Sequence, residues 1–229
     1  MKNRTIHSPH FVEDAVNIIL ESAQEAIEER GIFRLSLCGG NTPKPVYSAL
    51  AQSKEIPWEK VQLTFGDERC VPPDDTQSNY RMAKESLLDL IKIPEGNVFR
   101  MKGELPPEEA AHDYENKLHQ VATRFGEERY VHDLLLLGLG DDGHTASLFP
   151  ETAALNETGL NVVANYVPKF SKSRITFTFP LINAARGVCF LINDPAKGGV
   201  IEEILAGGSE YPAAKVMPAS GRLTWLLGF

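Results

Sequence analysis

The sequence contains few cysteines and no long apolar segment. Its three cysteines, Cys38, Cys70 and Cys189, are odd in number and widely spaced, without a C-x-x-C pair. This spacing argues against a disulfide framework and against a structural zinc site. No stretch approaches the ~20 apolar residues that span a bilayer, and residues 1–16 lack the apolar core of a signal peptide. We therefore expect a cytoplasmic protein without a membrane anchor.

Basic residues are outnumbered in this chain. There are 23 Lys and Arg against 31 Asp and Glu, which gives a formal net charge of −8, and the cations form no basic block. A nucleic-acid partner is therefore not expected. A small anionic ligand is compatible with this balance, because a few Arg and Lys side chains and backbone N–H groups suffice to bind it. The 229 residues, 42% of them hydrophobic, predict one soluble domain over residues 1–229.

Helical and strand patterns alternate along the chain. Apolar residues recur at helical spacing over residues 11–30 and stop at Gly31. The predicted strands are 32–37, 61–66, an unbroken apolar run around 134–137, 161–167, 174–180 and 187–193. Further helices are predicted to begin at Pro43 and to span 79–91, 107–125 and 195–206. This alternation predicts a three-layer α/β fold with a mostly parallel sheet and helices on both faces.

Three unusual loops follow predicted strands, and open α/β sheets bind ligands beyond the carboxyl ends of their strands. The first loop reads CGGNTP and leads into a helix. Its glycines permit close backbone approach, and the helix N-terminus offers unpaired N–H groups, so Gly39, Gly40, Asn41 and Thr42 form a candidate phosphate cradle. A plain tight turn is the alternative. The loop lacks the spacing of nucleotide-binding motifs, so a nucleotide is not expected.

Charged residues near strand ends are candidates for holding an anion. Asp67 and Arg69 follow the second strand and are two residues apart, so both are expected to face the crevice. Arg69 would bind a phosphate or carboxylate, while Asp67 holds it or contacts substrate hydroxyls. The alternative is a solvated loop with a local salt bridge. Arg174 and Lys197 are further candidates, although each is also compatible with an ordinary surface charge.

His144, in the third loop, GLGDDGHTAS, is the strongest catalytic candidate. An imidazole suits general-base catalysis near neutral pH, and Asp142 is close enough in sequence to orient it. A core histidine with a satisfied hydrogen bond is the alternative. No paired His or Cys ligands point to a metal site. The five other histidines lack such surroundings and are predicted to lie on the surface: His7, His10, His112, His119 and His132.

Several segments, in order, resemble the 6-phosphogluconolactonase family. They are SLCGGNTPKPVYSAL, FGDERCVPPDDTQSNYRMAKESLL, LLLLGLGDDGHTASLFP, RITFTFPLINAARGVCFLINDPAKGGV and PAAKVMPASGRLTWLL, and they cover nearly the whole chain. The resemblance implies hydrolysis of 6-phospho-D-glucono-1,5-lactone to 6-phosphogluconate, the second step of the oxidative pentose phosphate pathway, without a metal or organic cofactor. It also implies a fold related to sugar-phosphate isomerases and deaminases. The expected partner is the lactone alone, bound by a monomer or small homo-oligomer.

Within this resemblance, His144 is expected to activate water and Asp142 to support the imidazolium. The phosphate would rest on Gly39–Thr42 with Arg69 and Lys197, joined by Arg174. Backbone N–H groups near Gly143 are candidate oxyanion donors. The chain departs from the family pattern at Asn41, where members commonly carry Ser, and after Trp225, where many carry an Asp.

Two rival functions remain at this stage. One is an amino-sugar phosphate deaminase, whose matching loop resembles DGHIAFNEP and carries a glutamate where this chain has Phe149. Because phenylalanine cannot transfer a proton, the sequence favours the simpler hydrolysis. The other rival is a non-catalytic sugar-phosphate sensor, which would bind without turnover. Such proteins usually add a DNA-binding segment or lose the catalytic base, whereas this chain retains His144.

Overall fold

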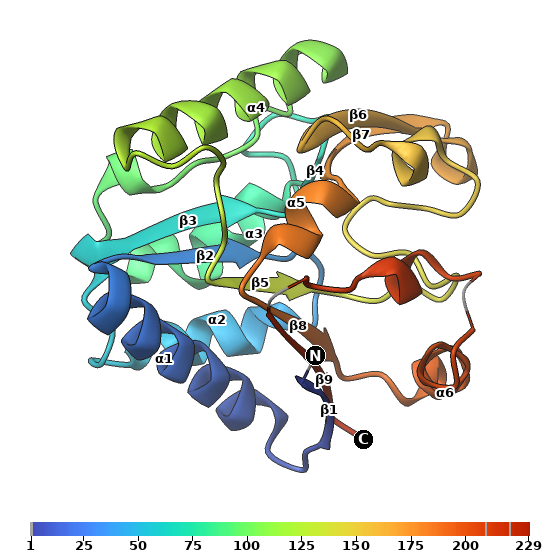
Figure 1. Cartoon of the computed structure of the whole chain (residues 1–229), viewed down its shortest axis with the longest axis horizontal. Helices are drawn as coiled ribbons and strands as arrows, with labels where there is room; N and C mark the ends of the chain where they lie inside the picture. Colours follow the sequence, from blue (N-terminus) through green and yellow to red (C-terminus); the bar gives the residue numbers. More distant parts are fainter. Residues whose placement is uncertain (1, 209, 220) are drawn as a thin grey trace.

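A six-stranded parallel sheet forms the centre of the molecule (Figure 1). The computed structural model describes residues 2–208, 210–219 and 221–229. The strand order is β1-β9-β8-β5-β2-β3, with bounds β1 Lys2–His7, β2 Phe33–Leu37, β3 Val61–Phe65, β5 Leu134–Leu137, β8 Gly187–Ile192 and β9 Arg222–Leu227. Each neighbouring pair of strands is parallel. The first and last strands lie side by side, so the two ends of the chain meet at one edge of the sheet.

Helices cover both faces of this sheet. The helices packed on one face are α1 Phe11–Arg30, α2 Pro43–Gln52 and α3 Asn79–Ser86, and those associated with the other face are α4 Pro107–Arg124, α5 Phe179–Ala184 and α6 Gly198–Leu205. Short 3₁₀ turns connect the elements: Trp58–Lys60, Leu88–Leu90, Glu95–Asn97, Ala153–Asn156, Pro168–Phe170 (η5), Pro195–Lys197 (η6) and Pro212–Lys215 (η7). In the described part of the chain, no helix combines the length and apolar character that a membrane crossing requires.

The four leucines of β5 show why this strand is apolar throughout. Leu135 and Leu137 pack into the core on the α4 face, whereas Leu134 and Leu136 pack into the core on the α1 and α2 face. All four side chains are buried because successive residues of a strand point to opposite faces of the sheet. The predicted strand buried on both faces is therefore confirmed, as is the three-layer α/β class.

A second, antiparallel sheet distinguishes the structure from the sequence prediction. It contains β4 Asp67–Arg69, β6 Val162–Val167 and β7 Lys172–Phe177 in the order β4-β7-β6. Helix α4 packs against β6 and β7. Two predicted strands thus belong to this sheet instead of the parallel one. The sequence analysis also missed β1, β4 and β9, because β1 and β4 are rich in polar residues and β9 lies at the end of the chain without a following helix.

Two helix ends also differ from the prediction. The α-helix expected over residues 79–91 ends at Ser86 and is followed by a 3₁₀ turn at Leu88–Leu90. The helix expected over 195–206 begins as the 3₁₀ turn Pro195–Lys197, capped by the Asp194 side chain, before α6 starts. Both differences lie in terminal turns, where 3₁₀ geometry is common.

His132 is fully buried, so its predicted surface position was wrong. The other four histidines predicted at the surface are exposed. Residue 132 leads directly into buried β5, and its carbonyl oxygen accepts a hydrogen bond from the Arg186 amide, which fixes the backbone inside the fold. The ring packs against Tyr130 and hydrogen-bonds Thr64 Oγ1 through Nε2 at 2.9 Å. Burial, with a contribution from the nearby Arg34 charge, lowers the pKa of His132 to about 3.

Replacing His132 with Gln tests this burial. The folded-state pKa of about 3 lies below the ordinary value of ~6.5, so unfolding takes up a proton between these two pH values. The stabilising contribution of the neutral ring is present above pH ~6.5 and is lost toward lower pH, by up to ~1.4 kcal/mol per pH unit. Urea unfolding of wild type should therefore show a steeper loss of stability from neutral pH to pH ~5 than His132→Gln shows.

The matched control is His112→Gln, which removes an exposed histidine from α4 and should retain the wild-type pH slope. Parallel stability curves for wild type and His132→Gln would contradict the assignment of this pH dependence to the buried ring.

Candidate active site

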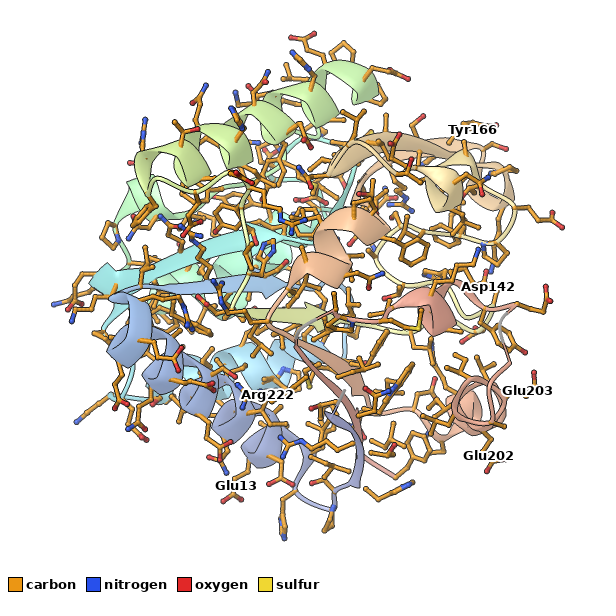
Figure 2. The ribbon with its side chains drawn as sticks, viewed as in Figure 1. Glu13, Asp142, Tyr166, Glu202, Glu203 and Arg222 are labelled. Carbon is orange, nitrogen blue, oxygen red and sulfur yellow. The ribbon has the colours of Figure 1, made fainter. Side chains whose placement is uncertain are left out.

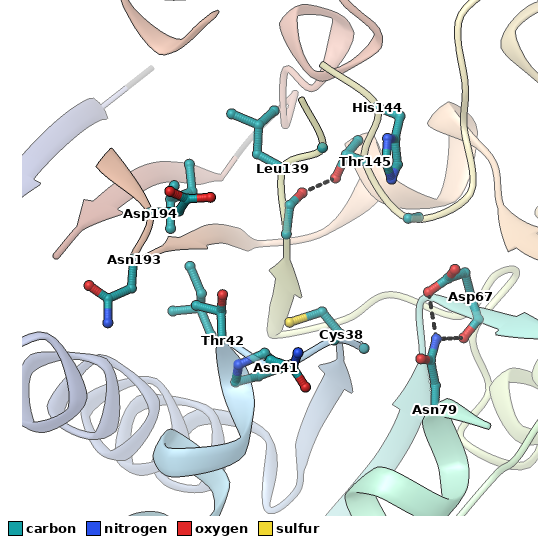
Figure 3. A pocket seen from close by; sticks show the side chains of 18 of the residues that line it. Cys38, Asn41, Thr42, Asp67, Asn79, Leu139, His144, Thr145, Asn193 and Asp194 are labelled. Atoms are coloured by element: carbon teal, nitrogen blue, oxygen red, sulfur yellow. Dashed lines mark hydrogen bonds between the residues drawn. The ribbon is translucent and has the colours of Figure 1, made fainter. Parts of the chain in front are cut away.

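A pocket of about 300 Å³ lies beyond the carboxyl ends of four parallel strands (Figure 3). Loops that follow β2, β3, β5 and β8 contribute to its lining. Strands β2 and β5 are neighbours, but the chain continues from β2 toward β3 on one side and from β5 toward β8 on the other. Such a reversal separates the following loops and opens a crevice, which is where α/β folds bind their ligands.

The loop Gly39–Thr42 lines the pocket in front of α2. Gly40 has φ +95°, a backbone conformation that favours glycine, and a Cβ on Gly39 would lie 2.0 Å from Asn79 Oδ1. Both glycines are therefore required by the local geometry. None of the four loop amides donates a hydrogen bond to another described residue. The loop offers unpaired N–H groups at a helix N-terminus, an arrangement that suits an anion.

Asp67 and Arg69 both line the pocket from β4. The Asp67 carboxylate accepts a hydrogen bond from Asn79 Nδ2 at 2.9 Å (Figure 3). It accepts a second one from Ser147 Oγ at 2.6 Å, and the two contacts fix its orientation. Arg69 donates through Nη1 to the Gln77 carbonyl, while its buried Nε has no hydrogen-bond partner among the described residues. Among the described residues, Asp67 and Arg69 therefore bond other partners and do not form the salt bridge with each other that the sequence left open. The sequence analysis missed Asn79 and Ser147, whose roles depend on contacts between distant segments.

His144 lies on the loop that follows β5, with one ring nitrogen engaged by Asp142. Nδ1 of His144 is 2.5 Å from Asp142 Oδ1, so an ionised Asp142 selects the tautomer that carries its proton on Nδ1. Nε2 is then left as a proton acceptor for a ligand. A Cβ on Gly140 would lie 1.9 Å from His144 Nδ1, which explains the glycine at that position. The imidazole stacks on the buried ring of Phe149, with centroids 3.9 Å apart.

The Asp142 carboxylate lies behind the imidazole, outside the residues that line the pocket. Partial burial acts to raise the pKa of Asp142, but hydrogen bonds from His144 and Lys169 outweigh this effect and lower the pKa to about 2. Asp142 is therefore ionised at neutral pH. A carboxylate in this position can orient the ring and stabilise an imidazolium.

Lys197 and Arg174 occupy different positions relative to the pocket. Lys197 lines it, and its Nζ donates to the Leu139 carbonyl at 2.6 Å and pairs with Asp141 Oδ1 at 3.0 Å. Arg174 is paired in register with Arg69 across β4 and β7 but lines a separate cavity that Arg69 shares. Burial, and secondly the Arg69 charge, lower the pKa of Arg174. The structure thus places Lys197 in the His144 pocket and Arg174 in the neighbouring cavity.

The described residues contain no group of three or more His, Cys, Asp or Glu side chains arranged to hold a metal ion. The pocket instead combines His144, which Asp142 holds from outside the lining, with a cradle of backbone amides, one lysine and one arginine. This combination can bind an anionic group and present a proton acceptor beside it.

Comparisons with known proteins agree with the sequence resemblance. The model of the family described as glucosamine-6-phosphate isomerases/6-phosphogluconolactonase matches residues 7–225. A protein of Synechocystis named 6-phosphogluconolactonase is 45% identical, covering 97% of this chain and 92% of its own. A human protein of the same name is 40% identical over 86% of this chain and 79% of its own.

Solved structures show the same relationship. The 6-phosphogluconolactonase of Thermotoga maritima superposes with a TM-score of 0.86 at 31% identity and covers 99% of both chains. That of Trypanosoma brucei gives a TM-score of 0.83 at 28% identity, covering 99% of this chain and 95% of its own. With the family model spanning nearly all of its residues, this chain belongs to the glucosamine-6-phosphate isomerase/6-phosphogluconolactonase family.

Proposed function

We propose that this protein hydrolyses 6-phospho-D-glucono-1,5-lactone to 6-phosphogluconate, the second step of the oxidative pentose phosphate pathway. The observation that carries the proposal is that His144, bonded to Asp142, lines the same pocket as the amide cradle. The names of the relatives support it, since the bacterial and human proteins described above are 6-phosphogluconolactonases. The proposed reaction uses side chains and backbone amides of this chain alone.

The substrate phosphate binds the amides of Gly39–Thr42, with Lys197 and Arg69 supplying positive charge. Asn41, at the position where family members commonly carry Ser, leaves this backbone cradle intact. Arg174, the register partner of Arg69 on β7, adds positive charge beside it from the neighbouring cavity. Asp67, fixed by Asn79 and Ser147, accepts hydrogen bonds from substrate hydroxyls. Anchoring the phosphate orients C1 of the lactone toward His144 and removes much of the entropic cost of reaction.

Hydrolysis then requires one proton acceptor and one proton donor at C1. Nε2 of His144 takes a proton from the attacking water, and Asp142 stabilises the resulting imidazolium. The imidazolium returns the proton to the ring oxygen as the C1–O bond breaks. The Gly143 amide, a candidate oxyanion donor from the sequence, already donates to the Gly140 carbonyl at 3.0 Å. That amide is therefore already paired within the loop.

Phe149 favours hydrolysis over the deaminase reaction. In the deaminase loop a glutamate occupies this position, whereas here an apolar ring, 5% exposed, stacks on His144. Isomerisation at C1 and C2 needs additional acid–base groups, and phenylalanine supplies none. Turnover of the lactone distinguishes the proposal from a sensor that only binds it.

We further propose that residues 1–229 act as a single domain in the cytoplasm, as a monomer or small homo-oligomer. The proximity of the two chain ends in one sheet is compatible with a single folded unit. Sedimentation velocity would determine the oligomeric state.

Substituting His144 with Ala tests the proposed base. We expect kcat to fall by ~10²–10⁴, because a general base is lost while the phosphate contacts remain. The measurement is acid release from freshly generated lactone in weak buffer, corrected for spontaneous hydrolysis. His112→Ala, on the distant α4 surface, is the control and should retain wild-type kcat. Near-wild-type kcat in folded His144→Ala would show that another group is the base.

Removing the Lys197 or Arg69 side chain tests the phosphate site. Lys197→Ala and Arg69→Ala should each raise KM for the phosphorylated lactone by roughly 10- to 100-fold, the effect of losing a charged hydrogen bond. The same variants should have a smaller effect on hydrolysis of unphosphorylated gluconolactone. Equal losses on both substrates would contradict a role in binding the phosphate.

A further inference from the structure

The turn between β6 and β7 contacts the loop that carries His144. This turn is η5, Pro168–Phe170, and Lys169 within it extends its Nζ to 2.9 Å from Asp142 Oδ2. The other oxygen of the same carboxylate, Oδ1, bonds His144 Nδ1. Figure 2 shows Asp142 on the same side of the molecule as Tyr166 of β6. One carboxylate therefore joins the turn to the imidazole.

The same turn also packs against Phe149, the ring that stacks on the imidazole. Phe170 packs edge-on against Phe149, with ring centroids 5.6 Å apart and an interplanar angle of 85°. Phe149 in turn stacks on the His144 ring. Ser171, which follows the turn, has φ +50°, so the backbone reverses there in a left-handed conformation. Two adjacent residues of η5 thus reach the carboxylate and the aromatic ring that flank His144.

The Lys169–Asp142 pair is better suited to orienting a carboxylate than to stabilising the fold. The Lys169 side chain is 56% exposed, and exposed ion pairs contribute little to folding stability. A carboxylate bonded only through Oδ1 is free to rotate about its Cβ–Cγ bond, whereas contacts at both oxygens fix its plane. Residues that orient a catalytic group in this way commonly affect activity without touching the substrate.

We propose that Lys169 is a positioning residue for His144: it holds Asp142 Oδ2 so that Oδ1 stays on Nδ1. The catalytic part of this inference rests on the proposed lactone hydrolysis. Its physical part, the effect of Lys169 on the Asp142–His144 hydrogen bond, does not.

The contact at Asp142 Oδ2 is separate from the contacts at Oδ1. Among the described residues, the ring and the backbone amide of His144 bond Oδ1, and Lys169 bonds Oδ2. The nearby charged groups Asp141 and Glu203 bond other partners, Lys197 and Tyr211. A substitution at Lys169 therefore removes the contact at Oδ2 and leaves the partners of Oδ1 in place.

The experiment compares Lys169→Met, Lys169→Arg and the control Lys172→Met, an exposed lysine on the same hairpin. Lys169→Met should lower kcat by about 10-fold with KM nearly unchanged, as expected for loss of an orienting contact. Lys169→Arg should restore most of the rate, and Lys172→Met should resemble wild type.

A second readout separates this inference from the proposed function. NMR of the hydrogen-bonded Nδ1–H proton of His144 in wild type and Lys169→Met, assigned by the signal missing in His144→Asn, requires no turnover. A weaker or faster-exchanging Nδ1–H signal in Lys169→Met supports the inference even if wild type fails to hydrolyse the lactone. Identical Nδ1–H signals and kcat values for the two proteins would overturn it. A rate loss accompanied by a lower melting temperature, with the Nδ1–H signal unchanged, would also overturn it by indicating a purely structural role.

Discussion

The parallel pairing of β2, β3, β5 and β8 is the constraint on which the rest of the structure depends. Parallel neighbours end at the same edge of the sheet, so four loops that are distant in sequence meet there. Burial of β5 on both faces anchors the central strand of this group. The candidate site residues in the pocket are mostly polar, yet their positions are set by the apolar strands that precede them. A change in strand register would therefore displace the amide cradle and His144 relative to each other.

At the pocket, local charge matters more than the net charge of −8. The cradle of Gly39–Thr42 supplies N–H groups without any side-chain charge, and Lys197 and Arg69 add two cations. On the other side, Asp142 is ionised and holds the imidazole in one tautomer. In the proposed hydrolysis, this arrangement separates phosphate binding from proton transfer at C1 of the lactone.

The sequence predicted the fold class and the three loops because each loop follows an apolar strand and is rich in glycine or charge. It did not predict β1 or β4, whose polar residues carry no clear strand pattern. His132 was misplaced because a single sequence gives no depth of burial, and its backbone is fixed by contact with Arg186. Lys169 was missed for a similar reason: its link to Asp142 joins segments 27 residues apart through a turn of unremarkable composition.

The most direct test of the account is a crystal structure of the protein with 6-phosphogluconate bound. We predict that the phosphate contacts the amides of Gly39–Thr42 and Lys197, while the C1 carboxylate lies within ~3.5 Å of His144 Nε2, the distance of a reactive complex. The reverse orientation, with the carboxylate on the glycine loop and the phosphate beside His144, would contradict the central claim. Binding outside this pocket would contradict it as well.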